Sequence, residues 1–281
     1  MREITKEQFV SAIRTLLVHA NYFLPEDFLQ AIKTAIETEV NLVAKDVLLK
    51  ILNNAEISSI TKLPLCQDTG IPQFFVDIGK DVCLNFDINA TVQNITAEVY
   101  ENEKLRCSCV VDPLKRTGKL HFGSVYIQCL NKDELDRRCK ISVLIRGGGS
   151  ENTSVFTNFL PTTNKEEIIT YITETIIKLL PYTCPPVIVG IGVGGVIEES
   201  MILAKKSLLR TIGIRNKDLF YAEIEKQIKD AVNNSGIGPL GLGGKTSVLD
   251  VFIEAAPTHI ATLPVSIVLQ CHSYRKHTVV L

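Results

Sequence analysis

The hydrophobic pattern of the chain changes its period after about residue 60, and this change limits the fold more than any other feature. Before it, apolar residues in 9–17 repeat at helical spacing, and Pro25 opens a second helix with Glu26 and Asp27 in its first turn. After it, β-like runs alternate with helical segments. We therefore expect a mixed α/β (α+β) fold, with a helical N-terminal segment packed on mixed β-sheets surrounded by helices.

The expected elements cover most of the chain without an internal repeat or an obvious linker. This continuity predicts one compact domain over residues 1–281, whose helical part spans about 1–60. A third N-terminal helix is expected at roughly 42–52 and another at about 90–105. The other helical segments are NKEEIITYITETIIKLL, VIEESMILAKKSLLR and KDLFYAEIEKQIKDAVN, and the strand-like runs are QFFVDIG, VCLNFDI, RCSCVVD, SVYIQCL, KISVLIR, PVIVGIG, SVLDVFIE and VSIVLQC.

The charge balance excludes some classes of partner. The formal net charge is -1 in 281 residues, with no long run of one sign, which argues against binding to nucleic acid. The N-terminus is charged from its second residue, and the most apolar stretch, PPVIVGIGVGGVI, is too short and too rich in glycine to span a bilayer. We expect a cytoplasmic protein without a membrane partner. A small acidic substrate is compatible with this charge balance, because its binding needs only a few cations at the site.

Two glycine-rich segments resemble phosphate-binding motifs. GIGVGG contains Gly190, Gly192 and Gly195 in the spacing of a dinucleotide fingerprint, between a predicted strand and a predicted helix. However, a second helix follows where the strand with a ribose-binding acid should be, so a nicotinamide-dependent enzyme is only a minor alternative. PLGLGGKT, residues 239–246, is rejected as a phosphate loop because a strand-like run follows it in place of a helix.

The eight cysteines fall into two groups. Cys66, Cys184 and Cys271 each lie at the edge of a predicted element, beside polar groups or prolines. They are too far apart for a zinc finger, whereas a cuboidal iron–sulfur cluster tolerates distant ligands and keeps one iron open when three thiolates hold it. The other five lie within or at the ends of strand patterns, where cysteine is usually a small buried hydrophobe. A non-catalytic scaffold with zinc remains an alternative, and its ligands would be Cys107, Cys109, Cys129 and Cys139.

Seven motifs occur in a fixed order along the chain: CQDTGIPQF, LRCSCVVDPL, GGGSEN, CPPVIVGIGVGG, LAKKSLLR, IGPLGLGG and PTHIATLPVSIVLQCHSYR. In this order they resemble the α-subunit of class I fumarases and tartrate dehydratases, which are iron–sulfur hydro-lyases. The resemblance runs from about Leu24 almost to the C-terminus. It implies a [4Fe-4S] cluster held by Cys66, Cys184 and Cys271.

The resemblance also implies roles for five residues. Gln67 and Asp68 would face the substrate beside the cluster, with Asp68 as a group for proton transfer. Arg106 and Gly149 match substrate contacts, and His259 matches a substrate-binding histidine that we count with Asp68 as catalytic. Each residue also has a simpler interpretation: Asp68 can form an Asx-turn, Arg106 can be an exposed charge, and His259 can be structural.

The expected reaction is the reversible hydration of fumarate to L-malate, with L(+)-tartrate dehydration as the alternative. Because the chain stops at Leu281, shortly after Cys271, we expect a separate β-subunit that completes the active site, within an (αβ)2 heteromer. RTGKLHFG stands where the family usually has an Asn-Thr-Pro-Ala type stretch, and Arg146 replaces a lysine before the glycines. These departures concern substrate specificity near Arg106 and leave the three cysteines unaffected.

Overall fold

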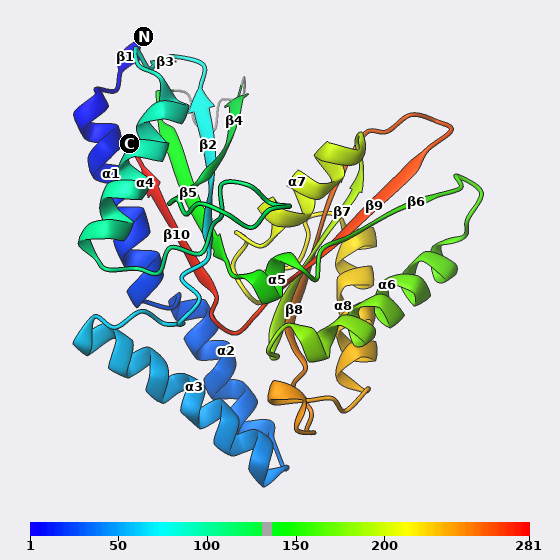
Figure 1. Ribbon diagram of the computed structural model, residues 1–281. Helices are drawn as coiled ribbons and strands as arrows, with labels where there is room; N and C mark the ends of the chain where they lie inside the picture. The colour runs from blue at the N-terminus through cyan, green and yellow to red at the C-terminus, as the bar shows by residue number, and fades with distance from the viewer. Residues whose placement is uncertain (131–136) are drawn as a thin grey trace. The chain divides into compact units, whose positions relative to one another are not determined.

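The structure is a computed structural model that describes residues 1–130 and 137–281. The chain forms two compact units. Unit 1 comprises Met1–Pro25, Ala55–Gly147 and Arg275–Leu281, and unit 2 comprises Glu26–Asn54 and Gly148–Tyr274. Helices and mixed sheets confirm the predicted α/β fold class (Figure 1). Among the described residues no helix is long and apolar enough to cross a membrane.

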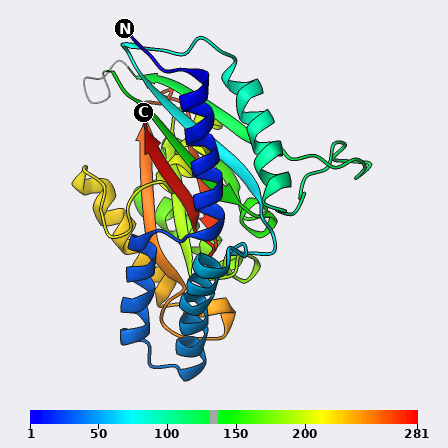
Figure 2. The same ribbon diagram turned by 90° about the vertical axis from the view of Figure 1, so that its left-hand side faces the viewer.

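Unit 1 is built on a four-stranded sheet with the order β10-β5-β2-β4. β2 pairs with β4 in parallel and with β5 antiparallel, and β5 pairs antiparallel with β10. Helices α1 and α4 pack against each other, and α1 contacts β5 and β10; Figure 2 shows the two helices side by side. The elements are β1 (Arg2–Glu3), α1 (Lys6–Tyr22), β2 (Ile71–Gly79), β3 (Val82–Cys83), α4 (Ile88–Asn102), β4 (Ser124–Leu130), β5 (Cys139–Arg146) and β10 (Arg275–Val280).

The core of unit 1 follows from the apolar face of α1. Thr5 caps this helix: its hydroxyl accepts from the backbone N–H of Gln8, whose side chain accepts from the Thr5 backbone N–H. The helix then buries Phe9, Ile13 and Leu16 against the sheet and α4. Apolar residues at i, i+4 and i+7 share one face of a helix. The residues whose spacing predicted this helix are therefore the ones that it buries in the core.

Unit 2 is built on a second four-stranded sheet with the order β6-β9-β7-β8. β7 is parallel to β8 and antiparallel to β9, which pairs antiparallel with β6. Helix α7 packs against β7, β8 and β9, while α8 packs against β8 and α6. The elements are α2 (Glu26–Thr38), α5 (Gly148–Glu151), β6 (Val155–Phe159), α6 (Lys165–Leu179), η1 (Leu180–Tyr182), β7 (Val187–Gly194), α7 (Ile197–Ser207), α8 (Leu219–Asn233), η2 (Pro239–Gly241), β8 (Val248–Ala256) and β9 (Leu263–Gln270).

Two buried carboxylates, Glu225 of α8 and Asp250 of β8, bind the segment after α7. Glu225 accepts from Arg210 Nη1 at 2.7 Å, and Asp250 pairs with Arg215. Both carboxylates are fully buried, and each has a second cation nearby, Arg215 for Glu225 and Lys229 for Asp250. Loss of one guanidinium would weaken the compensation of a buried charge and lower stability. The ion pairs therefore hold the α7–α8 connection in place.

Several expected elements differ from the observed ones. RCSCVVD is not a strand, and its described pairings are two isolated bridges, from Cys109 to Leu120 and from Asp112 to Thr117. Helix α3 (Leu42–Thr61) runs nine residues beyond its expected end and spans the boundary of the two units. VCLNFDI keeps only the two-residue β3, and the sequence patterns did not reveal the short edge strands β6 and β10. The prediction of a single domain stays a prediction.

Two histidines stack within unit 1, one from α1 and one from β10. The ring centroids of His19 and His277 lie 3.7 Å apart, with an angle of 14° between the ring planes. Burial lowers the pKa of both imidazoles; Lys62 lowers the pKa of His19 further, and His19 lowers that of His277. The stack is therefore compatible with neutral rings and opposes their protonation.

We expect this stack to make stability depend on pH. Because the folded pKa values lie below the ordinary value near 6.5, the unfolded chain binds more protons below that pH. Stability is fully present above pH 6.5 and is lost as the pH falls toward the lowered pKa values. His277→Phe should flatten the fall in thermal midpoint between about pH 7 and 5, as measured by calorimetry. His121→Gln, which removes a histidine outside the stack, should keep the wild-type slope; equal slopes in all three proteins would contradict the prediction.

Candidate functional site

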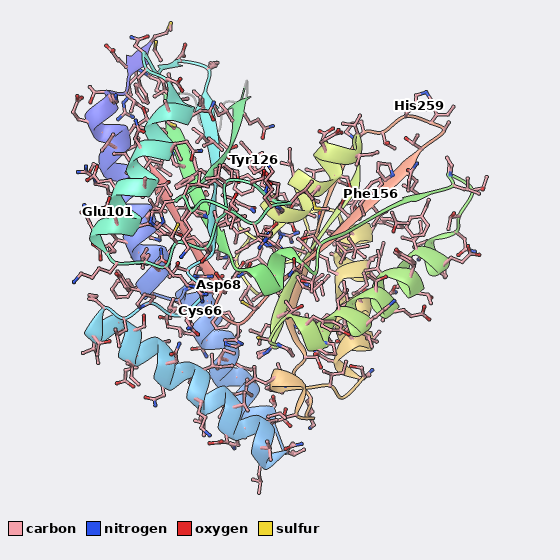
Figure 3. The ribbon with its side chains drawn as sticks, in the orientation of Figure 1. Cys66, Asp68, Glu101, Tyr126, Phe156 and His259 are labelled. Atoms are coloured by element: carbon pink, nitrogen blue, oxygen red, sulfur yellow. The ribbon has the colours of Figure 1, made fainter. Side chains whose placement is uncertain are left out.

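The segment CQDTG, residues 66–70, is an irregular loop between α3 and β2 (Figure 3). Its shape depends on contacts with other parts of unit 1, because it has no regular secondary structure. The Thr69 carbonyl accepts from the Tyr100 hydroxyl at 3.0 Å, and the Asp68 carbonyl accepts from Arg275 Nη1 at 2.9 Å. Two successive carbonyl groups of the loop are thus held by buried side chains of α4 and β10.

Asp68 forms the Asx-turn that the sequence allowed. Its Oδ1 accepts from the Gly70 backbone N–H at 2.9 Å and from the Ser108 hydroxyl at 3.4 Å. The other oxygen, Oδ2, lies against Gly147, where an added Cβ would be 2.6 Å from it. The turn uses one carboxylate oxygen and orients the second, so the structural role of Asp68 is compatible with a chemical one.

The segment around Arg106 lies against the same loop. The Thr69 hydroxyl donates to the Arg106 carbonyl at 2.8 Å, which places the backbone of this exposed arginine beside the residue that follows Asp68. Burial raises the pKa of the Cys109 thiol, and Cys107 and Asp68 raise it further. Unit 1 therefore brings Asp68, Arg106 and the pair of cysteines into one neighbourhood, together with Gln67 and Cys66 on the loop.

A second group of expected site residues meets within unit 2. The Cys184 carbonyl accepts from the His272 backbone N–H at 3.4 Å and contacts His272 Nδ1 at 3.0 Å. The Cys271 backbone N–H donates to the Ser150 hydroxyl at 3.2 Å, next to Gly149. Gly149, Cys184 and Cys271 thus lie on three separate segments that meet through hydrogen bonds of backbone groups with the Ser150 hydroxyl and with His272.

His259 lies at the other end of the same sheet. It precedes β9, whereas Cys271 follows it, and the eight residues of β9 extend over about 26 Å. β7 gives the same result, because Cys184 precedes this strand while Gly195, after it, accepts from the Thr258 hydroxyl at 2.9 Å. His259 is exposed, and its Nδ1 accepts from the Ala261 backbone N–H at 3.1 Å. Within unit 2, His259 is therefore separated from Cys184 and Cys271.

Close packing explains the dinucleotide-like glycines. A Cβ on Gly190 would lie 2.1 Å from the Ala204 carbonyl oxygen, and one on Gly192 would lie 1.9 Å from that of Ser200. These glycines face α7, while the alternate residues Val189 and Ile191 lie in the apolar core of unit 2. The helix α8 follows α7 before the next strand, as the sequence predicted. The glycines let α7 approach the sheet, so the motif needs no nucleotide to explain it.

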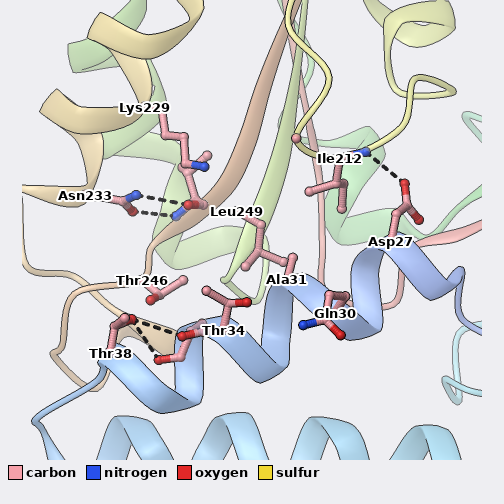
Figure 4. A pocket seen from close by; sticks show the side chains of 13 residues that line it. Asp27, Gln30, Ala31, Thr34, Thr38, Ile212, Lys229, Asn233, Thr246 and Leu249 are labelled. Atoms are coloured by element: carbon pink, nitrogen blue, oxygen red, sulfur yellow. Dashed lines mark hydrogen bonds between the residues drawn. The ribbon is translucent and has the colours of Figure 1, made fainter.

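The rejected phosphate loop also has a structural explanation. β8, and no helix, follows PLGLGGKT, as expected. The loop is instead held by Glu39, whose carboxylate accepts from the Lys245 backbone N–H at 2.8 Å, and an added Cβ on Gly244 would lie 2.8 Å from a Glu39 oxygen. A groove of about 350 Å³ near this loop is shown in Figure 4. None of the expected site residues lines it; it is bordered by Asp27, Gln30, Ala31, Thr34, Ala35, Thr38, Ile212, Gly213, Lys229, Asn233, Thr246, Val248 and Leu249.

The cysteines whose side chains the structure describes form no disulfide bonds. Cys184 is exposed, whereas Cys66 and Cys271 are half-buried. In neither unit do the described residues form a group of three or more His, Cys, Asp or Glu side chains that could hold a metal ion. For the zinc alternative, Cys139 is buried in β5, and the side chain of Cys129 lies outside the described part of the structure. The structure thus provides no preformed zinc site among the side chains it describes.

Three residues that support these loops were not singled out from the sequence. Ser150 and His272 connect the segments of Cys271 and Cys184, and Arg275 holds the Asp68 loop. Each lies within one of the seven motifs, GGGSEN or PTHIATLPVSIVLQCHSYR, close in sequence to a candidate site residue. This closeness was the signal by which the sequence could have pointed to them. Their partners lie more than 80 residues away in the chain, which no local pattern reveals.

Comparison with known proteins first defines the class of this protein. The family described as "Fumarate hydratase (Fumerase)" matches residues 10–280. A protein of Methanocaldococcus jannaschii is 39% identical over 271 residues, 93% of each chain, and carries the provisional name L(+)-tartrate dehydratase subunit alpha. The L(+)-tartrate dehydratase subunits alpha of Escherichia coli and Shigella sonnei are each 27% identical over 290 residues, 100% of this chain and 94% of theirs.

These matches identify a hydro-lyase type of subunit, because hydratases and dehydratases catalyse the two directions of one reaction class. The chain belongs to the fumarate hydratase family. The resemblance that the seven motifs indicated is thereby confirmed.

Proposed function

We propose that this chain is the α-subunit of an iron–sulfur hydro-lyase that catalyses the reversible hydration of fumarate to L-malate together with a β-subunit. The observation that carries the proposal is the main-chain link between the segments of Cys184 and Cys271 inside unit 2. The "subunit alpha" names of the relatives support a partner subunit. An (αβ)2 heteromer in the cytoplasm remains the expected assembly.

Cys66, Cys184 and Cys271 are the residues that would hold a [4Fe-4S] cluster. Their chemistry fits this group, since all three are cysteines outside disulfide bonds, in irregular segments and not inside a strand. Three thiolates suit iron–sulfur ligation and leave one position for a substrate. When bound, the cluster supplies a Lewis-acidic iron that polarises the substrate hydroxyl.

The remaining roles belong to side chains and backbone groups of this chain. Asp68, whose Oδ1 is fixed by the Gly70 backbone N–H, would transfer a proton at the substrate hydroxyl. Arg106 can form a bidentate pair with a substrate carboxylate, and Gln67 can donate a hydrogen bond from its amide. At Gly149 the backbone can approach the substrate because no side chain intervenes.

The cluster assignment predicts that single thiols are essential for cluster assembly. After anaerobic reconstitution with iron and sulfide, the chain should show a broad charge-transfer absorption and bound iron and sulfide. Cys184→Ser, Cys66→Ser and Cys271→Ser should each lose most of both signals, since each removes one of the proposed ligands.

Cys83→Ser is the matched control, because Cys83 is also half-buried but lies in β3 and contacts Asn85. It should keep the absorption and the metal content of the wild type. Bound zinc without sulfide in the wild type would support the scaffold alternative, and an absorption that survives Cys184→Ser would refute the ligand set.

We further propose that His259 serves the active site of a second α chain. The length of β9 and of β7 supports this, since His259 lies about 26 Å from the Cys271 end of its own sheet. No side chain spans that distance. A substrate-binding role for His259 therefore requires a second copy, which the symmetric (αβ)2 assembly would provide.

The surface around His259 is suited to such a contact. Ile260 is 88% exposed beside it, and the neighbouring ends of β6 and β7 add further exposed apolar side chains. Clustered exposed apolar residues commonly mark protein interfaces. The apolar residues at this end of the sheet are Leu160, Val196, Ile197 and Ile260.

Mixing two inactive variants tests this arrangement. His259→Ala and Cys184→Ser α chains, each in complex with the β-subunit, should be inactive alone. Hybrid complexes with one chain of each kind contain one site with neither defect, so random mixing should restore about one quarter of the wild-type activity. If mixed complexes stay as inactive as the parents although mass spectrometry shows hybrid formation, His259 acts in its own chain or not at all.

The substrate is proposed to be L-malate or fumarate, with L(+)-tartrate as the second candidate because relatives carry that name. The reconstituted αβ complex should dehydrate L-malate with a kcat/KM at least about tenfold above that for L(+)-tartrate, since the two differ by one hydroxyl that the site must accommodate. The α chain alone should show little or no activity. The opposite ratio would assign tartrate, and robust turnover by pure α would remove the need for a β-subunit.

A further inference from the structure

Arg275 is a buried cation with an unusual position in unit 1. It is the first residue of β10, pairs in register with Ile145 of β5, and is 1% exposed. Neither the sequence motifs nor the family resemblance assigned it a role. Burial of a guanidinium is costly unless specific contacts compensate it, so its surroundings indicate what it does.

The described hydrogen bond of Arg275 goes to the active-site loop. Its Nη1 donates to the Asp68 carbonyl at 2.9 Å, while its Nε is buried without a hydrogen-bond partner among the described residues. If the guanidinium only stabilised the sheet, we would expect its N–H groups to donate to acceptors within the sheet. Arg275 instead contacts the backbone of the residue that we propose for proton transfer.

Two glycines make room for this contact on both sides of the loop. Gly70 has a φ of +68°, and a Cβ there would lie 2.6 Å from the Arg146 carbonyl oxygen and 3.1 Å from Arg275 Nη2. A Cβ on Gly147 would lie 2.6 Å from Asp68 Oδ2 and 3.7 Å from Arg275 Nη2. The guanidinium and the Asp68 carboxylate therefore flank the same point on the backbone of Gly147.

The contacts of Asp68 make its direction depend on the backbone that Arg275 holds. Oδ1 is bound to the Gly70 N–H, so the carboxylate turns together with the peptide units of the loop. Tyr100 holds the Thr69 carbonyl at 3.0 Å, and Arg275 holds the preceding Asp68 carbonyl. Loss of the guanidinium would remove this contact to the Asp68 peptide and leave in place every group that we propose to touch the substrate.

We propose that Arg275 is a positioning residue that sets the orientation of Asp68 for proton transfer. The inference rests on the proposed function and adds to it a residue outside the expected site. A positioning residue should act mainly on kcat, because the substrate carboxylates are bound by other groups. A displacement of about 1 Å at a reacting group can reduce a rate about 100-fold.

The test uses the reconstituted αβ complex with Arg275→Gln and Arg275→Lys. Arg275→Gln should lower kcat about 100-fold and change KM by less than about threefold, with wild-type iron and sulfide content. Arg275→Lys keeps a charged donor without the planar fork and should recover part of the lost kcat. Added guanidinium ion should partly restore Arg275→Ala, whereas urea at the same concentration should not.

Arg210→Gln is the matched control for general loss of stability. It also removes a guanidinium that binds a buried partner, the Glu225 carboxylate of unit 2. It should lower the thermal midpoint and leave kcat per folded complex unchanged. The comparison of the two variants therefore distinguishes a general loss of stability from a specific displacement of Asp68.

Three results would overturn the inference while the wild type remains active with its cluster. They are an unchanged kcat in Arg275→Gln, an effect confined to KM, and a loss of cluster that accounts for the lost activity. A wild-type αβ complex that holds iron and sulfide but hydrates neither substrate, or that holds no cluster, overturns the proposed function and this inference with it.

Discussion

The fixed rise of an extended strand is the constraint on which the arrangement of unit 2 depends. β7 and β9 lie side by side at the centre of the second sheet, and α7 packs on them through the glycine face of β7. Because a strand can neither shorten nor bend back on itself, it keeps the groups at its two ends apart. Cys184 and Cys271 are joined at one end and His259 stands at the other. Because of this separation, His259 and the two cysteines of one chain cannot contact the same substrate, and a shared site would need a second copy of the chain.

The CQDTG loop shows a different kind of constraint, in which an irregular segment takes its shape from its partners. Its consecutive carbonyls are held by Tyr100 and Arg275, and its own Asx-turn orients Asp68. Without strand or helix hydrogen bonds of its own, such a loop would otherwise lose order. The glycines at 70 and 147 serve the same purpose, since any side chain there would collide with the backbone at 146 or with the Asp68 carboxylate.

Periodicity predicted the long elements well and the short ones poorly. Helices such as α1 and α6, and central strands such as β2 and β7, carry enough apolar residues to show their period. The edge strand β10 begins with four consecutive polar residues and has only two valines, and β6 has only five residues. RCSCVVD has the composition of a strand, yet Cys109 and Asp112 make only isolated bridges, and the Arg106 carbonyl binds the CQDTG loop through Thr69. Local composition does not encode such a partner.

The sequence by itself determined the family, the α/β class and the identity of the candidate cysteines, because these depend on which residues occur and in what order. Only the tertiary structure decided which of them meet. It joined Cys184 to the residue after Cys271 across 88 positions, placed Arg275 on a loop 207 positions away, and used the glycines of GIGVGG for helix packing. The physical reason is that hydrogen bonds and close contacts form between surfaces, and the surfaces exist only after distant segments have folded against one another.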